Sequence, residues 1–284
     1  MAVSALDIKK LREETDAPLM ECRAALEEAG NDFEKAKEIL REKGKAAAAK
    51  RVGRATTAGI VAFATSADQK IVSGVVLECE TDFVARNEEF AQLAQQVAEV
   101  FVQHEPGAHP LDVSFNGQSV ASLIEAGVAK IRENIELKKA VRIAADHPLS
   151  VYLHHDKAKG AVVQMEGAAS NLLEIGRQVA IQCIAFPPEV VSKSDIAQDV
   201  LDRELEIETQ RAIHEGKNPE MAKNIAQGRI NKEFLRRVVL LEQPFYKHHN
   251  QPNQTVGHFV EEEANTGGGT AKVIRFMRLA VGEN

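Results

Sequence analysis

The chain has 284 residues, of which 44% are hydrophobic and 27% charged, a composition typical of a globular protein with room for about two domains. Its 35 Lys and Arg residues against 42 Asp and Glu residues give a net charge of −7 at pH 7. This acidic balance, with no Trp and only 2 Tyr, argues against general nucleic-acid binding, which needs excess positive charge or stacking rings.

The N-terminal segment is expected to form three short helices, over residues 4–15, 16–30 and 31–44. Asp16 is the expected N-cap of the second helix and Asn31 that of the third, and Gly44 is the expected end of the third. The apolar residues of the second helix recur at helical spacing: Leu19, Cys22, Leu26 and Ala29. Because so small a bundle has a thin core, we interpret it as an interaction module and not as a catalytic domain.

Residues 43–59, KGKAAAAKRVGRATTAG, form a basic, Ala-rich segment that we expect to be a partly helical linker. Its Lys and Arg residues allow two interpretations, a solvated linker or a contact with RNA. The sequence favours the first, because charge runs of this kind are usually solvated.

The next part of the chain alternates between strand and helix patterns. A polar turn at 66–69 separates two β-type runs, which indicates a hairpin. The helix that follows carries Phe90, Ala94, Val97 and Phe101 on one face. The other expected elements are strands at 60–65, 71–78 and 139–145 and a helix at 120–136.

The same order returns about 90 residues later, with strands at 151–154 and 161–165 and a helix at 171–185. This similarity of order predicts a weak internal repeat of two subdomains. Ser194 is then expected to cap a long helix that ends at Gly216, and Asn218 to start a second one antiparallel to it. A helix at 256–264 and a strand at 272–281 follow, so this helical hairpin is an insertion, either projecting from the core or packed along it.

The sequence contains no motif for a phosphate-binding loop, a nucleophile elbow or a zinc protease. The adjacent pairs His154–His155 and His248–His249 are poor metal sites, because neighbours on a strand point to opposite faces. The cysteines lack a CxxC motif and are expected to be buried small hydrophobes: Cys22, Cys79 and Cys183. We therefore expect no catalytic residue, no metal and no cofactor.

The expected location is the cytoplasm. No apolar run approaches the ~18 residues of a membrane span, and the N-terminus lacks the apolar core of a signal peptide. Three scattered cysteines without a disulfide pattern fit a reducing compartment.

The segment TDFVARN, residues 81–87, follows the second strand and allows two interpretations. If the next helix begins near Glu88, Asp82 and Phe83 lie in a surface loop, where an apolar ring beside a carboxylate is unusual. If the helix begins earlier, Asp82 is an N-cap and Phe83 joins Phe90 on the core face. The pattern alone favours the second interpretation.

Several stretches of the chain resemble the bacterial elongation factor Ts family, over essentially the whole length. The specific ones are ECETDFVARNEEF, close to the family signature, and LMECRAAL near the start; supporting ones are KIRENIELKKAVRI, YLHH and QPFYKHHNQPNQTVGHF leading to VIRFMRLAVGE. The resemblance implies a guanine-nucleotide exchange factor, without bond-making chemistry, that binds GDP-bound and nucleotide-free elongation factor Tu.

The resemblance also implies which residues bind the partner. Those expected near the partner's Mg²⁺ site, where they promote GDP release, are Thr81, Asp82, Phe83 and Val84. Leu19 and Met20 are expected to contact the same G domain, and His154 another domain of the partner. A homodimer is compatible with the family, and neither a membrane nor direct nucleic-acid binding is expected.

The predicted fold class is α+β. A ubiquitin-associated-like module with the basic linker occupies residues 1–54, core subdomain N residues 55–145, core subdomain C residues 146–192 and 240–284, and a coiled-coil hairpin residues 193–239. The chain departs from the family at Asp16 and Arg132, where glycine is common, and we expect the contact that a C-terminal helix makes in some relatives to be absent. The alternatives to an exchange factor are a ribosome- or RNA-associated adaptor and, less favoured, a small hydrolase.

Overall fold

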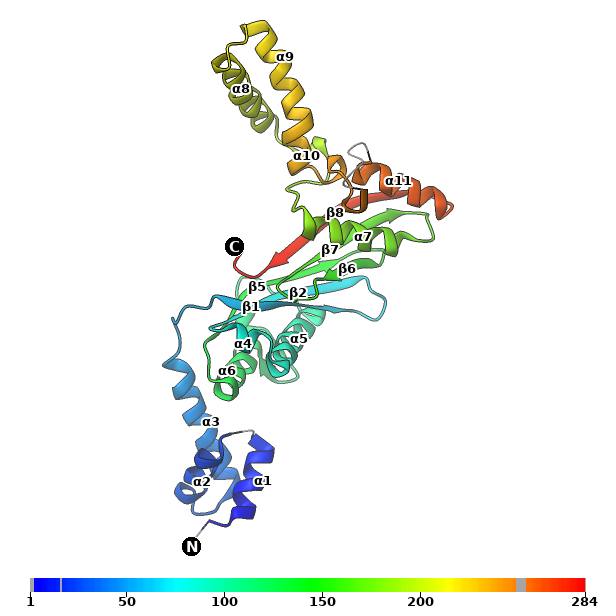
Figure 1. Ribbon diagram of the computed structural model, residues 1–284. Helices are drawn as coiled ribbons and strands as arrows, with labels where there is room; N and C mark the ends of the chain where they lie inside the picture. Colours follow the sequence, from blue (N-terminus) through cyan, green and yellow to red (C-terminus); the bar gives the residue numbers. More distant parts are fainter. Residues whose placement is uncertain (1–2, 16, 249–253, 284) are drawn as a thin grey trace. The chain divides into compact units, whose positions relative to one another are not determined.

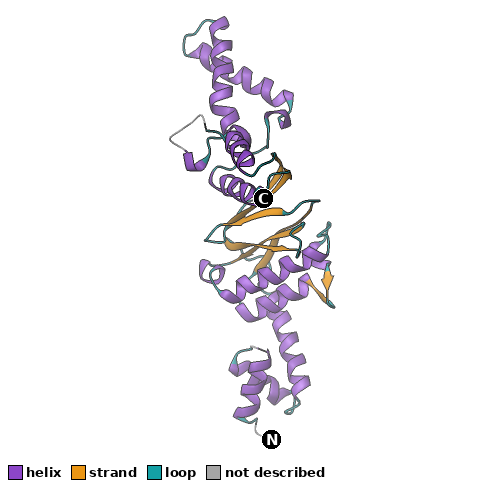
Figure 2. Cartoon of the chain, turned by 90° about the vertical axis from the view of Figure 1, so that its right-hand side faces the viewer, coloured by secondary structure: helices purple, strands orange, loops and turns teal. Residues whose placement is uncertain are grey.

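A computed structural model describes residues 3–15, 17–248 and 254–283, and it shows an α+β protein in which helices accompany small sheets (Figures 1 and 2). Within these residues no helix is both long and apolar enough to cross a membrane. The chain divides into two compact units. Unit 1 consists of Met1–Thr65, Ser73–Ile143 and Ala280–Asn284, and unit 2 of Ser66–Val72 and Ala144–Leu279. The four domain boundaries expected from the sequence stay a prediction.

Three helices open unit 1: α1 (Ala5–Thr15), α2 (Leu19–Glu28) and α3 (Phe33–Ala49). The side chains that fill the core between them are Leu11, Cys22, Ala25, Leu26, Ala29, Ala36 and Leu40. Pro18 occupies the N-cap position of α2, and the predicted cap Asp16 lies outside the described residues. Gly30, at a φ of 64°, ends α2 as expected, because glycine adopts this left-handed conformation without steric cost.

Two expectations for α3 are wrong. The helix continues past Gly44 to Ala49, because the alanines that follow are the strongest helix formers. A Cβ atom at Gly44 would lie 3.0 Å from the Cβ of Ala129, so the glycine serves close helix packing and not termination. Asp32, and not Asn31, caps the helix by accepting a backbone hydrogen bond.

The sheet of unit 1 has the strand order β1-β2-β5. The elements of this part are β1 (Ala58–Thr65), β2 (Ile71–Cys79), α4 (Asp82–Ala85), α5 (Glu88–Gln103), the 3₁₀ turn η1 (Pro110–Asp112), β3 (Ser114–Phe115), β4 (Gln118–Ser119), α6 (Val120–Ile131) and β5 (Ile135–Ala144). The predicted apolar face of α5 is confirmed, with all four residues buried: Phe90, Ala94, Val97 and Phe101.

The helix predicted at 120–136 is too long by five residues, since α6 ends at Ile131. Arg132 has a φ of 69°, a left-handed conformation that terminates a helix and that glycine adopts more easily. The next two residues, Glu133 and Asn134, hydrogen-bond to residues that follow β2. These long-range bonds replace the turns that would have extended α6.

Unit 2 holds a second three-stranded sheet, of order β6-β7-β8. Its elements are β6 (Leu149–Leu153), β7 (Lys159–Gly167), α7 (Leu172–Ala185), α11 (Val256–Thr266) and β8 (Ala271–Ala280). β6 and β7 pair antiparallel, with Tyr152 opposite Ala161. The last strand returns to a sheet begun earlier, as predicted, because β8 joins β7. The buried side chains packed between this sheet and α7 and α11 include Val163, Met165, Ile175, Val179, Cys183 and Val260.

A helical hairpin lies between α7 and α11 in the chain (Figure 1). It consists of α8 (Gln198–His214) and α9 (Pro219–Arg229), which continues through a π-helical turn (Ile230–Phe234) into α10 (Leu235–Val238). Short 3₁₀ turns flank it: η2 (Lys193–Asp195), η4 (Leu240–Glu242) and η5 (Tyr246–His248). Asn218 starts α9 as predicted, since its side chain accepts a hydrogen bond from the backbone N–H of Met221 at 2.8 Å.

Ser194 does not cap α8, contrary to expectation. It lies inside η2, where Ser192 and Asp195 form a reciprocal capping box. α8 begins three residues later, with Ala197 as its N-cap. The earlier 3₁₀ turn therefore uses the local capping chemistry, and the following helix starts without a side-chain cap.

Candidate functional site

Residues 82–85 form a one-turn helix, α4, two residues after the end of β2. Thr81 is its N-cap, and the Thr81 Oγ1 atom accepts a hydrogen bond from the N–H of Val84 at 3.3 Å. Neither interpretation from the sequence was right in detail, because Asp82 and Phe83 lie in a helix but Asp82 is not its cap. A separate helix, α5, begins at Glu88 as expected.

Phe83 is 82% exposed, so it does not join the core face of α5. Asp82 is also exposed and forms an ion pair with Arg86 at 3.1 Å. Val84 is half-buried. An exposed aromatic ring of this size leaves a large apolar area in water, and rings of this kind are frequent anchors in protein–protein interfaces.

The carboxylate of Glu133, in the connection between α6 and β5, holds the start of α4. The two oxygens of Glu133 accept hydrogen bonds from Thr81, from its backbone N–H at 3.0 Å and from its hydroxyl at 2.6 Å. Glu80, the residue before Thr81, accepts a hydrogen bond from the backbone N–H of Asn134 at 2.7 Å. Sequence reasoning missed Glu133, and the only signal for it was its place in the KIRENIELKKAVRI run.

Leu19 and Met20 lie at the start of α2 and are 50% and 67% exposed. The expectation that Leu19 belongs to the apolar stripe of this helix is wrong, because Cys22, Ala25 and Leu26 fill the core. Both side chains remain available on the outer side of the module.

His154 lies in the turn between β6 and β7, in unit 2. Its Nδ1 atom is 3.0 Å from the hydroxyl of Tyr152, and its ring centroid is 4.3 Å from that of His155. The two histidines therefore do not point apart, since β6 ends at Leu153 and the strand alternation ends with it. The predicted partner-binding residues thus fall on three elements: α4, α2 and the β6–β7 turn.

The structure gives little support for metal or thiol chemistry. Among the residues that the structure describes, no group of three or more metal-binding side chains comes together. The pair His248–His249 lies outside the described residues, because His249 is not described. The three cysteines are buried and free, as predicted, and burial raises the pKa of Cys79 and of Cys183 to about 12.

We expect the native protein to resist thiol reagents at pH 8. Burial holds Cys79 and Cys183 as thiols, so the reactive thiolate is scarce until the pH approaches 12. A colorimetric disulfide reagent should label these residues only after unfolding by urea. The pKa of both thiols is raised above the ordinary value of 9.0, so their contribution to stability is complete below pH 9 and is lost as the pH rises toward 12. Rapid labelling of the folded chain at pH 8 would contradict this prediction.

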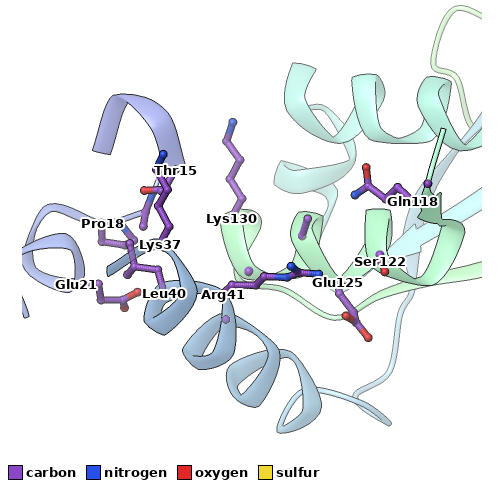
Figure 3. Close-up of a pocket in the computed structure, with 15 residues that line it drawn as sticks. Thr15, Pro18, Glu21, Lys37, Leu40, Arg41, Gln118, Ser122, Glu125 and Lys130 are labelled. Atoms are coloured by element: carbon purple, nitrogen blue, oxygen red, sulfur yellow. The ribbon is translucent and has the colours of Figure 1, made fainter. Parts of the chain in front are cut away.

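A groove of about 540 Å³ in unit 1 is lined by side chains of α2, α3 and α6 (Figure 3). Its charged residues carry both signs: Glu21, Lys37, Arg41, Glu125 and Lys130. The ammonium of Lys37 is already paired with Glu14 at 2.6 Å and Glu34 at 3.0 Å, and these partners raise its pKa. Among the described residues that line the groove, none is a predicted site residue and no nucleophile is paired with a base.

Exposed aromatic rings such as that of Phe83 are enriched in protein–protein interfaces. Comparison with known proteins identifies the family to which the chain belongs. A family model described as Elongation factor TS matches residues 80–283. The protein called Elongation factor Ts in Aquifex aeolicus is 38% identical to this chain, over 99% of both chains. The one in Clostridioides difficile is 35% identical to it, over 99% of this chain and 93% of its own. A third, from Alkalilimnicola ehrlichii, is 38% identical over 100% of this chain and 93% of its own.

The chain therefore belongs to the elongation factor Ts family. The family's proteins are translation elongation factors, which places this chain in protein biosynthesis.

Proposed function

We propose that the protein is a guanine-nucleotide exchange factor that binds elongation factor Tu and promotes GDP release, without a cofactor and without bond-making chemistry. The relatives named Elongation factor Ts support the proposal. The observation that carries it is the exposed Phe83, held beside Asp82 on a helix that is anchored at its first residue. This role would place the protein in the cytoplasm with the translation machinery.

Exchange requires only a difference in affinity. A factor that binds the nucleotide-free partner better than the GDP-bound partner lowers the affinity for GDP by the same ratio, because the coupling is reciprocal. Each ~1.4 kcal/mol of coupling changes the nucleotide affinity about tenfold. An aromatic anchor that is desolvated only in the complex is a suitable source of such energy.

Phe83 and Asp82 would enter near the partner's Mg²⁺ site. Mg²⁺ in nucleotide sites is held by few protein ligands together with the phosphates, so displacing the elements that carry those ligands weakens both the metal and the β-phosphate contacts. Thr81 and Val84 have supporting roles in this proposal, since Thr81 caps α4 and Val84 is a half-buried residue within it.

The other contacts extend the same interface. The first three helices would form a ubiquitin-associated-like module whose Leu19 and Met20 bind the partner's G domain. His154, oriented by Tyr152, would contact another domain of the partner. The predicted division into two core subdomains and a coiled-coil insertion belongs to this proposal as well.

The direct experiment measures release of labelled GDP from purified elongation factor Tu. We expect catalytic amounts of this protein to accelerate GDP release by at least tenfold. Without it, GDP release from elongation factor Tu is limited by the tight binding of Mg²⁺ and the phosphates. Unaltered release at saturating protein would contradict the proposal. A parallel titration with salt separates exchange from an RNA-binding adaptor, whose affinity falls steeply with ionic strength.

The structure offers little for the adaptor alternative. Arg51 donates a hydrogen bond from Nε to the carbonyl of Arg132 at 3.0 Å. Arg54 lies 3.6 Å from the carboxylate of Glu80. Lys43 is also paired, with Glu28 at 2.5 Å, so at least three of the linker's positive charges have intramolecular partners, and we do not propose direct nucleic-acid binding.

A further inference from the structure

We propose that Glu133 is a positioning residue that sets the orientation of α4 and so controls how Phe83 and Asp82 are presented to the partner. The inference rests on the proposed function. It assigns to Glu133, the second residue after α6, a role in exchange that operates through its hydrogen bonds to Thr81.

The first step concerns the size of α4. A helix of one turn, Asp82–Ala85, is too short to be stable by its own hydrogen bonds, because nucleation costs more than a single turn returns. Its direction must therefore come from what holds its ends. The next helix, α5, follows only after Arg86 and Asn87, so it does not extend α4 as a continuous rod.

The second step concerns the first residue of the turn. Thr81 donates its hydroxyl hydrogen to Glu133 Oε1 at 2.6 Å and its backbone N–H to Glu133 Oε2 at 3.0 Å. Because the hydroxyl hydrogen is committed to Glu133, the lone pairs of Thr81 Oγ1 point toward the N–H of Val84, 3.3 Å away. One carboxylate thereby fixes both the backbone direction and the capping rotamer at the start of α4. Hydrogen bonds to an ionised group are among the stronger ones in proteins.

The third step is that Glu133 is itself fixed. The left-handed turn at Arg132 directs the chain away from α6, and Asn134 on the other side is only 4% exposed. The Asn134 side chain donates to the carbonyl of Arg54 at 2.8 Å and to Glu136 at 2.9 Å. Its backbone N–H binds Glu80 at 2.7 Å, so consecutive residues of one connection hold the consecutive residues Glu80 and Thr81 of the other.

The variant that tests this role is Glu133→Gln. The amide keeps the shape of the side chain but has one oxygen in place of two, so it accepts one of the two hydrogen bonds from Thr81 and loses the charge. We expect α4 to sample other orientations while the sheet stays folded. The matched control is Glu105→Gln, which changes a charge in the same unit and affects a carboxylate paired with Arg142 on β5, away from α4.

A double-mutant cycle on stimulated GDP release separates positioning from general stability. We expect Glu133→Gln to reduce stimulation about fivefold in the native background and less than twofold in a Phe83→Ala background, because its effect passes through Phe83. Glu105→Gln should leave stimulation unchanged in both. An equal loss in the two backgrounds, or no loss in the native one, overturns the inference.

A second readout does not depend on the partner. We expect the N–H of Val84 to exchange with solvent at least fivefold faster in Glu133→Gln, while the amides within α5 keep their native rates. Unchanged exchange at Val84 overturns the inference even if GDP release is slow. If the native chain does not stimulate GDP release, the proposed function fails, and the inference fails with it. Normal stimulation by Phe83→Ala leaves the exchange function standing but removes the proposed role of Phe83 and therefore the inference. Reduced stimulation by Phe83→Ala beside normal stimulation by Glu133→Gln overturns the inference alone.

Discussion

Replacing Asp82 and Phe83 together by alanine is expected to slow stimulated GDP release at least tenfold while leaving the fold intact. The ring is 82% exposed, and the carboxylate is exposed and pairs with the exposed Arg86, so neither side chain contributes much to folding. Surface substitutions of this kind usually change stability by about 0.5 kcal/mol or less. Removing an aromatic anchor from the centre of an interface costs about 2 kcal/mol or more, which is more than tenfold in rate.

The matched control for this variant is Phe186→Ala. Phe186 is 50% exposed at the end of α7, in the other unit, and belongs to no predicted contact. Phe186→Ala should stimulate GDP release at the native rate. This result would show that losing an exposed ring does not by itself slow GDP release. Normal stimulation by a folded Asp82→Ala/Phe83→Ala variant would count decisively against the proposed role of α4.

The elements that could be predicted from the sequence are those with local signals. α5 and α7 have apolar stripes of helical period, and α9 begins with an Asn–Pro pair that caps and starts a helix. The end of α6 was not predicted, because an arginine does not by itself indicate a left-handed conformation; the glycine common in the family at position 132 was the available signal. The start of α8 lies later than expected, because Ser192 and Asp195 form a capping box for the 3₁₀ turn that precedes it.

The candidate site divides in the same way. The pattern favoured a buried Phe83 because seven residues, about two helical turns, separate it from Phe90. That spacing aligns side chains only along one continuous helix, and the chain breaks between α4 and α5. The Glu133–Thr81 contact spans 52 residues and depends on β5 lying next to β2, which no local pattern specifies.

Replacing Leu19 and Met20 by alanine is expected to weaken binding to nucleotide-free elongation factor Tu about tenfold or more, measured by calorimetry. Both side chains are largely exposed, at 50% and 67%, while the core of the three helices is made by other residues. The free energy of unfolding should therefore stay within about 0.5 kcal/mol of the native value.

The matched control is Leu6→Ala, in α1 of the same module, because Leu6 is 78% exposed and belongs to no predicted contact. Its affinity should equal that of the native chain. Removing residues 1–53 should lower the affinity at least as much as the double substitution, while the helices and sheet that follow remain folded by circular dichroism. If instead the shortened chain and the Leu19→Ala/Met20→Ala variant both bind with native affinity, the module has no part in the interface, and partner binding must come from α4 and the second unit alone.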